Sequence, residues 1–151
     1  MNRMQLVKEL LVESRKSAIA QVSFNERLRE YAPGEMLFMR EAHFIMAVGL
    51  EDAPTMSELA HRLDVTQGAV TQIAARLESK GYITRCKAQA DRRQTTVALT
   101  EKGKLLYRDH IAYDDKQFAR VSEWYDEFSD EELALFTRYE QSKMALFTKN
   151  K

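Results

Sequence analysis

Two short helices joined by a tight turn are predicted by Thr55-Met-Ser-Glu-Leu-Ala-His-Arg-Leu-Asp-Val-Thr-Gln-Gly-Ala-Val-Thr-Gln-Ile-Ala-Ala-Arg-Leu-Glu-Ser-Lys-Gly81. Thr55 and Glu58 have the capping-box spacing that begins a helix. Asp64-Val65 supplies the turn, and Thr66 has the hydroxyl that caps a second helix. Gly81 is a natural helix C-terminus. The segment therefore has the pattern of a helix-turn-helix.

A two-stranded β-ribbon is predicted directly after Gly81. Residues 82–87 and 95–99 are short and rich in Tyr, Ile, Thr and Val, and the second alternates in polarity. Between them lies a polar loop with the basic tip Asp91-Arg92-Arg93. A helix that enters the major groove beside a basic ribbon that enters the minor groove is suited to reading duplex DNA.

The flanking segments are predicted to be helical. Residues 3 to about 30 have apolar side chains at helical spacing and no Gly or Pro, and Pro33-Gly34 then breaks the helix. A second helix is expected from Glu35 or Leu37 to Gly49. Thr100 caps a long helix, and Ser129 to Glu132 is a capping box that begins the last one.

These expectations give a mainly α fold with a small β-wing. We expect one domain over residues 1–151, with a winged helix-turn-helix at about 37–100 and dimerisation helices at 1–32 and 101–151. Phe118, Val121 and Tyr125 repeat at the spacing of a seam for a partner helix. A two-fold dimer places two reading helices about one DNA turn apart, ~34–36 Å.

Charge is balanced overall and uneven along the chain. The 23 basic and 23 acidic side chains cancel. Residues 55–108 have a balance of +5 and residues 109–141 a balance of −7, so one region suits phosphates and the other does not. No charged start is followed by an apolar run and no apolar run comes near 18 residues, so we expect no secretion by that route; the lone Cys86 excludes an internal disulfide. We expect a cytoplasmic protein without a membrane partner.

One combined pattern is specific enough to suggest a family. The chain carries Leu59-Ala-x-x-Leu63-x-Val65-Thr66-x-x-x-Val70-Thr71-x-x-x-x-x-Leu77-Glu78-x-Lys80-Gly81-Tyr82-Ile83-x-Arg85, then Asp91-Arg92-Arg93 and Leu99-Thr100-Glu101-Lys102-Gly103. Over about residues 37–107 it resembles the MarR family of winged helix-turn-helix regulators. The resemblance implies a homodimer that binds a pseudo-palindromic operator as a repressor and responds to a small effector.

The expected DNA contacts lie on the second helix of the motif, at the start of the first and at the ribbon tip. Gln pairs with adenine and Arg with guanine, while Thr contacts a base or a thymine methyl. By the resemblance, Arg93 enters the minor groove and Asp91 orients it; Arg76 has the alternative of pairing with Asp91 or Glu78. The full candidate set is Thr55, Ser57, Thr66, Gln67, Gly68, Thr71, Gln72, Arg76, Asp91, Arg92 and Arg93.

Two kinds of effector are compatible with the residues. His43 and His110 resemble zinc-ligand histidines of zinc-uptake repressors in this family, and Asp114 stands where those have a further His, with Asn25 or Glu26 as an uncertain fourth ligand. No cofactor is required, and a hydrogen-bonded His pair is the alternative. An organic effector is expected in a pocket lined by Tyr31, Phe38, His43, Phe44 and Tyr107, where core packing is the alternative.

Two other classes of protein fit less well. An enzyme is disfavoured because no phosphate loop, catalytic triad or complete metal motif is present. A helical adaptor for proteins would not need the Asp91-Arg92-Arg93 tip or the uneven charge. Cys86 is not where peroxide-sensing members of the family carry their cysteine, which argues against redox sensing.

Overall fold

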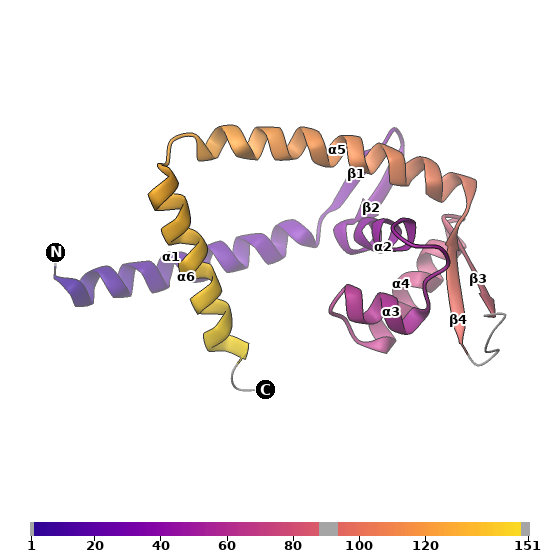
Figure 1. Ribbon diagram of the computed structural model, residues 1–151, viewed down its shortest axis with the longest axis horizontal. Coiled ribbons are helices and arrows are strands. Elements are labelled where there is room, and N and C mark those ends of the chain that lie inside the picture. Colours follow the sequence, from indigo (N-terminus) through magenta and orange to yellow (C-terminus); the bar gives the residue numbers. More distant parts are fainter. Residues whose placement is uncertain (1, 88–93, 149–151) are drawn as a thin grey trace. The chain divides into compact units, whose positions relative to one another are not determined.

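The fold is mainly helical with two short antiparallel hairpins, as the sequence predicted (Figure 1). The computed structural model describes residues 2–87 and 94–148, so the predicted contacts Asp91, Arg92 and Arg93 lie outside the described residues. The elements in chain order are α1 (Arg3–Asn25), β1 (Leu28–Ala32), β2 (Glu35–Phe38), α2 (Met39–Gly49), α3 (Met56–Arg62), α4 (Gln67–Ser79), β3 (Ile83–Lys87), β4 (Thr95–Leu99), α5 (Glu101–Tyr125) and α6 (Asp130–Thr148).

The chain divides into two compact units, residues 1–112 and 113–151, with the boundary inside α5. The first unit contains both hairpins and the helices α1 to α4, and the second contains the end of α5 and α6. No helix in the described part of the chain is long and apolar enough to span a membrane.

A winged-helix core, residues 39–99, holds most of the buried apolar side chains. Helix α2 contacts α3, α4 and β4, and so lies at the centre of this core. Phe44 on α2, Leu59 on α3 and Leu77 on α4 are all completely buried. Burial of apolar surface of this kind is the main favourable contribution to folding.

The predicted helix ends are confirmed in the core. The Thr55 hydroxyl accepts from the Glu58 backbone N–H at 3.2 Å, and the Glu58 carboxylate accepts from the Thr55 backbone N–H at 2.7 Å. The Thr66 hydroxyl accepts from Ala69 N at 3.2 Å and caps α4. Asp64 has φ +50° in the turn between the helices, a conformation that Asp tolerates better than most residues.

The wing is joined tightly to the core. Strands β3 and β4 pair in register from Ile83–Leu99 to Lys87–Thr95, and Val97 N also donates to the Pro54 carbonyl at 2.9 Å. At the base, Gly103 lies so close to the Tyr82 carbonyl that a Cβ would lie 2.1 Å from that oxygen. A residue with a side chain at position 103 would therefore push α5 away from the wing.

The prediction that residues 3 to about 30 form one helix, followed by another from Glu35 or Leu37, is wrong at the junction. Helix α1 ends at Asn25, and the next residues form the hairpin β1–β2 that pairs Leu28 with Phe38. Gly34 has φ +78°, so Pro33-Gly34 is a hairpin turn rather than a helix break. Tyr31 and Leu37 are buried because β1 and β2 contact α2.

The terminal helices differ from the core in their exposure. Helix α1 contains no buried residue, and even its apolar side chains Leu11, Ile19 and Val22 are more than half exposed. In the second unit, Phe128 and Phe136 pack edge to face with ring centroids 5.3 Å apart, beside an apolar groove of about 680 Å³. The predicted capping box is present there: Ser129 N donates to the Glu132 carboxylate at 2.9 Å.

Candidate nucleic-acid interface

Helix α4 has one buried and one exposed face. Val70, Ile73 and Leu77 are buried against the core, and the opposite face is polar. The Thr71 hydroxyl donates to the Gln67 carbonyl at 2.7 Å, which fixes the direction of its methyl group. All the predicted contact residues of this helix and its cap are exposed: Thr66, Gln67, Gly68, Thr71, Gln72 and Arg76.

Gly68 is not required by the fold. A Cβ at this position would meet no atom closer than the Thr66 hydroxyl oxygen, 4.0 Å away. The position lies in the first turn of α4, where an alanine would be accommodated without rearrangement. The open space beside Gly68 therefore leaves the α4 backbone accessible to a molecule that approaches it.

The start of α3 contributes polar groups next to α4. Thr55, Ser57 and Thr71 line a polar cavity of about 500 Å³ together with Arg85 of the wing. The Thr55 hydroxyl also donates to Glu58 at 2.8 Å, so its first role is to cap α3. Glu58 has a pKa below the ordinary value because it accepts hydrogen bonds from the Thr55 backbone and side chain. Ser57 is exposed beside it.

An ion pair joins the wing to α4. Arg85 Nε on β3 donates to Glu78 Oε2 at 2.9 Å, and this hydrogen bond lowers the pKa of the Glu78 carboxyl. Glu78 was one of two partners expected for Arg76, but it is occupied by Arg85. Arg76 Nε instead lies 3.7 Å from Glu41 Oε1, a buried carboxylate on α2. Asp91, the other expected partner, lies outside the described residues.

The sequence did not reveal the role of Glu41. Its signal is a charge that follows Arg40 and begins the run Glu41-Ala-His-Phe-Ile, in which every residue but His43 is buried. A charged side chain in such a place normally has partners elsewhere in the fold. Those partners, Arg76 and Lys80, are far along the chain, so only the structure identifies them.

The histidines proposed as zinc ligands are near each other. The His43 and His110 ring centroids are 6.4 Å apart, and Tyr31 stacks on His110 at 4.9 Å. His110 is buried and His43 exposed. Asp114 belongs to the second unit. Within residues 2–87 and 94–148, no group of three or more His, Cys, Asp or Glu side chains is placed to hold a metal ion.

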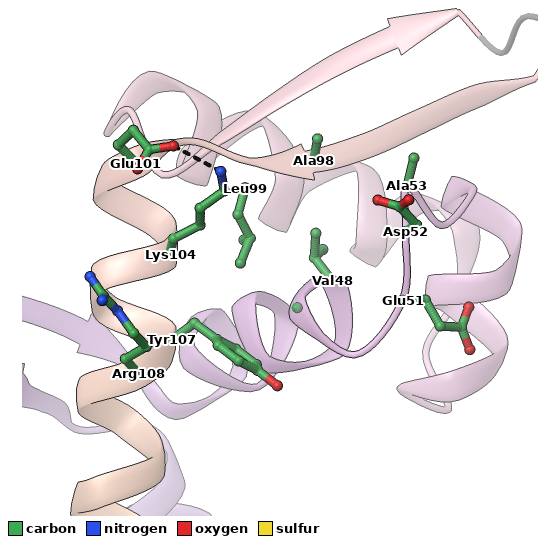
Figure 2. A pocket seen from close by; sticks show the side chains of 11 residues that line it. Val48, Glu51, Asp52, Ala53, Ala98, Leu99, Glu101, Lys104, Tyr107 and Arg108 are labelled. Carbon is green, nitrogen blue, oxygen red and sulfur yellow. Dashed lines mark hydrogen bonds and ion pairs between the residues drawn. The ribbon is translucent and has the colours of Figure 1, made fainter.

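The residues proposed to line an organic effector pocket are divided between two places. Tyr31 and His43 lie near His110, and Phe44 is completely buried in the core. Tyr107 lies against the backbone of Gly49, where a Cβ would be 2.3 Å from the ring. It faces a separate cavity of about 630 Å³ between α5 and the loop after α2 (Figure 2).

This cavity has an apolar floor and a charged rim. Figure 2 shows Lys104 and Arg108 projecting from α5, with Asp52 and Ala53 on the opposite loop. Lys104 Nζ is 2.8 Å from Glu101 Oε1 and so is already paired. Ala53 has φ +54°, a left-handed conformation that is uncommon for residues other than glycine. The volume is in the range of small-molecule sites.

Comparisons with known proteins match this arrangement. A family model described as the MarR family matches residues 38–94. The chain is 24% identical over 142 residues to the uncharacterised HTH-type transcriptional regulator YhjH of Bacillus subtilis, covering 91% of this chain and 81% of that protein.

Two solved structures are similar over nearly the whole chain. The zinc-responsive MarR family member ZitR of Lactococcus lactis has a TM-score of 0.72 at 26% identity, covering 92% of this chain and 98% of its own. FabT of Streptococcus pneumoniae, solved in complex with DNA, has a TM-score of 0.67 at 28% identity, covering 98% and 99%. Both matches thus extend beyond the winged-helix core.

Proposed function

Because the chain belongs to the MarR family of winged helix-turn-helix regulators, we propose that it binds operator DNA sequence-specifically and represses transcription as a homodimer. One observation carries the proposal: α4 presents an exposed polar face at the edge of a fully packed core. Its relative FabT has been solved in complex with DNA, which supports the same partner for this chain. Its relative YhjH is also named a transcriptional regulator.

The side chains of α4 have the chemistry of base readout. Gln67 and Gln72 are able to pair bidentately with adenine in the major groove, and the methyl of Thr71 suits a thymine methyl. Gly68 allows the α4 backbone to approach the DNA. Ser57 and the cavity it lines supply hydroxyl groups for phosphates, which fix register without reading sequence.

The wing is assigned the neighbouring minor groove. In this proposal Arg92 and Arg93 supply the cations, as the sequence predicts, and Asp91 orients Arg93. An arginine is attracted to a narrow minor groove by its negative potential. Support comes from the family membership and from the way Arg85 fixes the base of the wing to α4 through Glu78.

The terminal helices are assigned to dimerisation. No residue of α1 is buried within the described chain, and exposed apolar surface of this kind normally marks an interface. A two-fold axis gives the same contact to both copies and matches a pseudo-palindromic operator. The groove in the second unit, between α5 and α6, adds to this surface.

An effector that prefers one spacing of the two α4 helices would switch DNA binding. We place an organic effector first, in the cavity of Tyr107 or beside Tyr31 and His43. Zinc is the second candidate because the relative ZitR is zinc-responsive and His43 lies near His110. Two imidazoles are fewer than the roughly four ligands of a usual zinc site. Zinc titration of operator affinity tests it: no change at saturating metal removes zinc.

The experiment that tests the function is selection of bound genomic fragments by the full chain, followed by fluorescence anisotropy. We expect a preference for an inverted repeat over random duplex of equal length, and a steep salt dependence. Gln72→Ala should cost about 1–3 kcal/mol at particular base pairs only. Arg93→Ala should weaken binding severely and leave the dimer folded. Equal affinity for operator and random duplex would contradict the proposal.

A further inference from the structure

Glu41 is a fully buried carboxylate next to the DNA-reading helix. It lies in the first turn of α2, before the buried Ala42 and Phe44, and its side chain has no exposed surface. Removing a carboxylate from water is strongly unfavourable unless other groups replace the lost hydration. Its partners are therefore essential to the local structure.

Those partners come from the last turn of α4 and its C-cap. Lys80 Nζ lies 3.0 Å from one carboxylate oxygen of Glu41 and 3.2 Å from the other, and Arg76 Nε lies 3.7 Å from the carboxylate. Phe38 N also donates to it at 3.0 Å. One carboxylate thus fastens the end of α4 to the beginning of α2.

A second glutamate holds the chain just beyond α4. Glu35 on β2 accepts a hydrogen bond from the Tyr82 hydroxyl, and its carboxylate lies 3.2 Å from Lys102 Nζ on α5. The turn between the two attachments contains Gly81, with φ +77°. The segment from Glu35 to Glu41 therefore holds α4 on one side of this turn and the start of the wing and α5 on the other.

We propose that Glu41 is a positioning residue for sequence discrimination: it fixes the direction of α4, and with it the base-reading side chains. This inference rests on the proposed DNA-binding function. Hydrogen bonds to base edges require close alignment, whereas phosphate contacts depend mainly on charge. Glu41 also holds Arg76 and Lys80 on the protein, so neither is assigned a DNA contact. In this proposal Arg76 braces α4, and its assignment as a base-reading residue stays a prediction.

The stability of the fold alone does not explain the arrangement. A buried ion pair adds little net stability compared with apolar groups of the same size, and its best-attested role is to specify one geometry. The side chains of Arg76 and Lys80 remain 44% and 38% exposed, so each is able to change without leaving a cavity. Discrimination between DNA sequences is the property that a fixed α4 would serve.

The test compares Glu41→Gln with Glu101→Gln in the full-length dimer. Glu101 is a matched control, since it also lies in the first turn of a helix and pairs with a lysine, Lys104 at 2.8 Å. Affinity is measured for the selected operator and for random duplex across a salt series. We expect Glu41→Gln to weaken operator binding roughly tenfold, as for a lost base contact, with random-duplex affinity and salt slope unchanged. Glu101→Gln should change neither.

The possible outcomes distinguish a failure of the positioning role of Glu41 from a failure of the proposed DNA-binding function. An equal fall in both affinities, or unchanged discrimination in Glu41→Gln, overturns the positioning role. A wild-type protein with no operator preference overturns the proposed function instead. If Glu41→Gln does not fold, Lys80→Gln decides: lower discrimination at an unchanged random-duplex salt slope supports the inference. A slope reduced by about 0.9 would make Lys80 a phosphate contact and overturn it.

Discussion

The winged-helix core and the terminal helices use their apolar residues in opposite ways. In the core, Phe44, Leu59 and Leu77 have no exposed surface, while α1 leaves apolar side chains such as Leu11 and Ile19 more than 60% exposed. The core thus buries its apolar side chains within one chain, whereas α1 leaves its apolar side chains exposed. We therefore expect that α4 folds independently of the proposed contact between subunits.

The largest effect is expected from the core. Leu77→Ala removes a completely buried side chain of α4 and should lower the free energy of unfolding by about 2–5 kcal/mol. Leu50, 66% exposed after α2, is the matched control, and Leu50→Ala should change stability by about 0.5 kcal/mol or less. Urea unfolding followed by circular dichroism measures both. Similar losses in the two variants would mean that the core is not packed as described.

The next effect is expected at the subunit contact. Val7→Glu with Leu11→Glu places two charges on the apolar face of α1 and should give a monomer, with operator affinity reduced about a hundredfold or more by loss of bivalent binding. Lys16→Glu changes the net charge equally on the opposite face and should remain dimeric. Light scattering and anisotropy provide the readouts. A double variant that stays dimeric would exclude this face of α1 from the interface.

A smaller effect is expected where the core meets DNA. Gly68→Ala adds one methyl group that the fold accommodates, so unfolding stability should stay equal or rise by up to about 1 kcal/mol. Operator affinity should nevertheless fall roughly tenfold, because the methyl separates α4 from the base edges. Anisotropy and urea unfolding on the same sample compare the two. Undiminished operator affinity would show that the backbone at Gly68 does not approach DNA.

The smallest effect is expected in the pH dependence of the unfolding free energy. The hydrogen bond from Tyr82 lowers the pKa of Glu35 in the folded state from its ordinary value of 4.5, and Lys102 acts in the same direction. The resulting stability is present above the unfolded pKa and is lost as pH falls through the folded one. The unfolding free energy of Glu35→Gln should therefore fall less than that of the wild type between pH 5 and 3. Glu127→Gln, on an exposed residue, should follow the wild type.

Features that depend on residues close together in the chain could be predicted from the sequence. Helix caps such as Thr55 with Glu58, and Thr66 with Ala69, join residues three apart, so a local pattern is sufficient. The wing was also predictable, because Thr95 to Leu99 alternates in polarity and pairs with its neighbour in sequence. Exposure of the α4 face follows from helical spacing alone.

Two features of the structure could not be predicted from local sequence patterns. The sequence predicts helix where the structure has the β1–β2 hairpin, because Leu28 and Tyr31, three residues apart, fit helical spacing as well as they fit a strand that packs on α2. The Glu41–Lys80 pair joins residues 39 apart, and many acidic and basic residues were available as partners. Such contacts depend on how α2 and α4 pack, which local spacing does not specify.

Open space around Gly68 has a consequence for a cell that carries two alleles of the gene. A product with alanine there would fold, and by the proposed dimerisation through the terminal helices it would still pair with the normal product. With equal amounts of the two products and random pairing, about three quarters of the dimers would contain at least one defective half and would release the operator. Such an allele would be dominant, whereas an allele that destroys the apolar packing of Leu77 would be degraded and recessive.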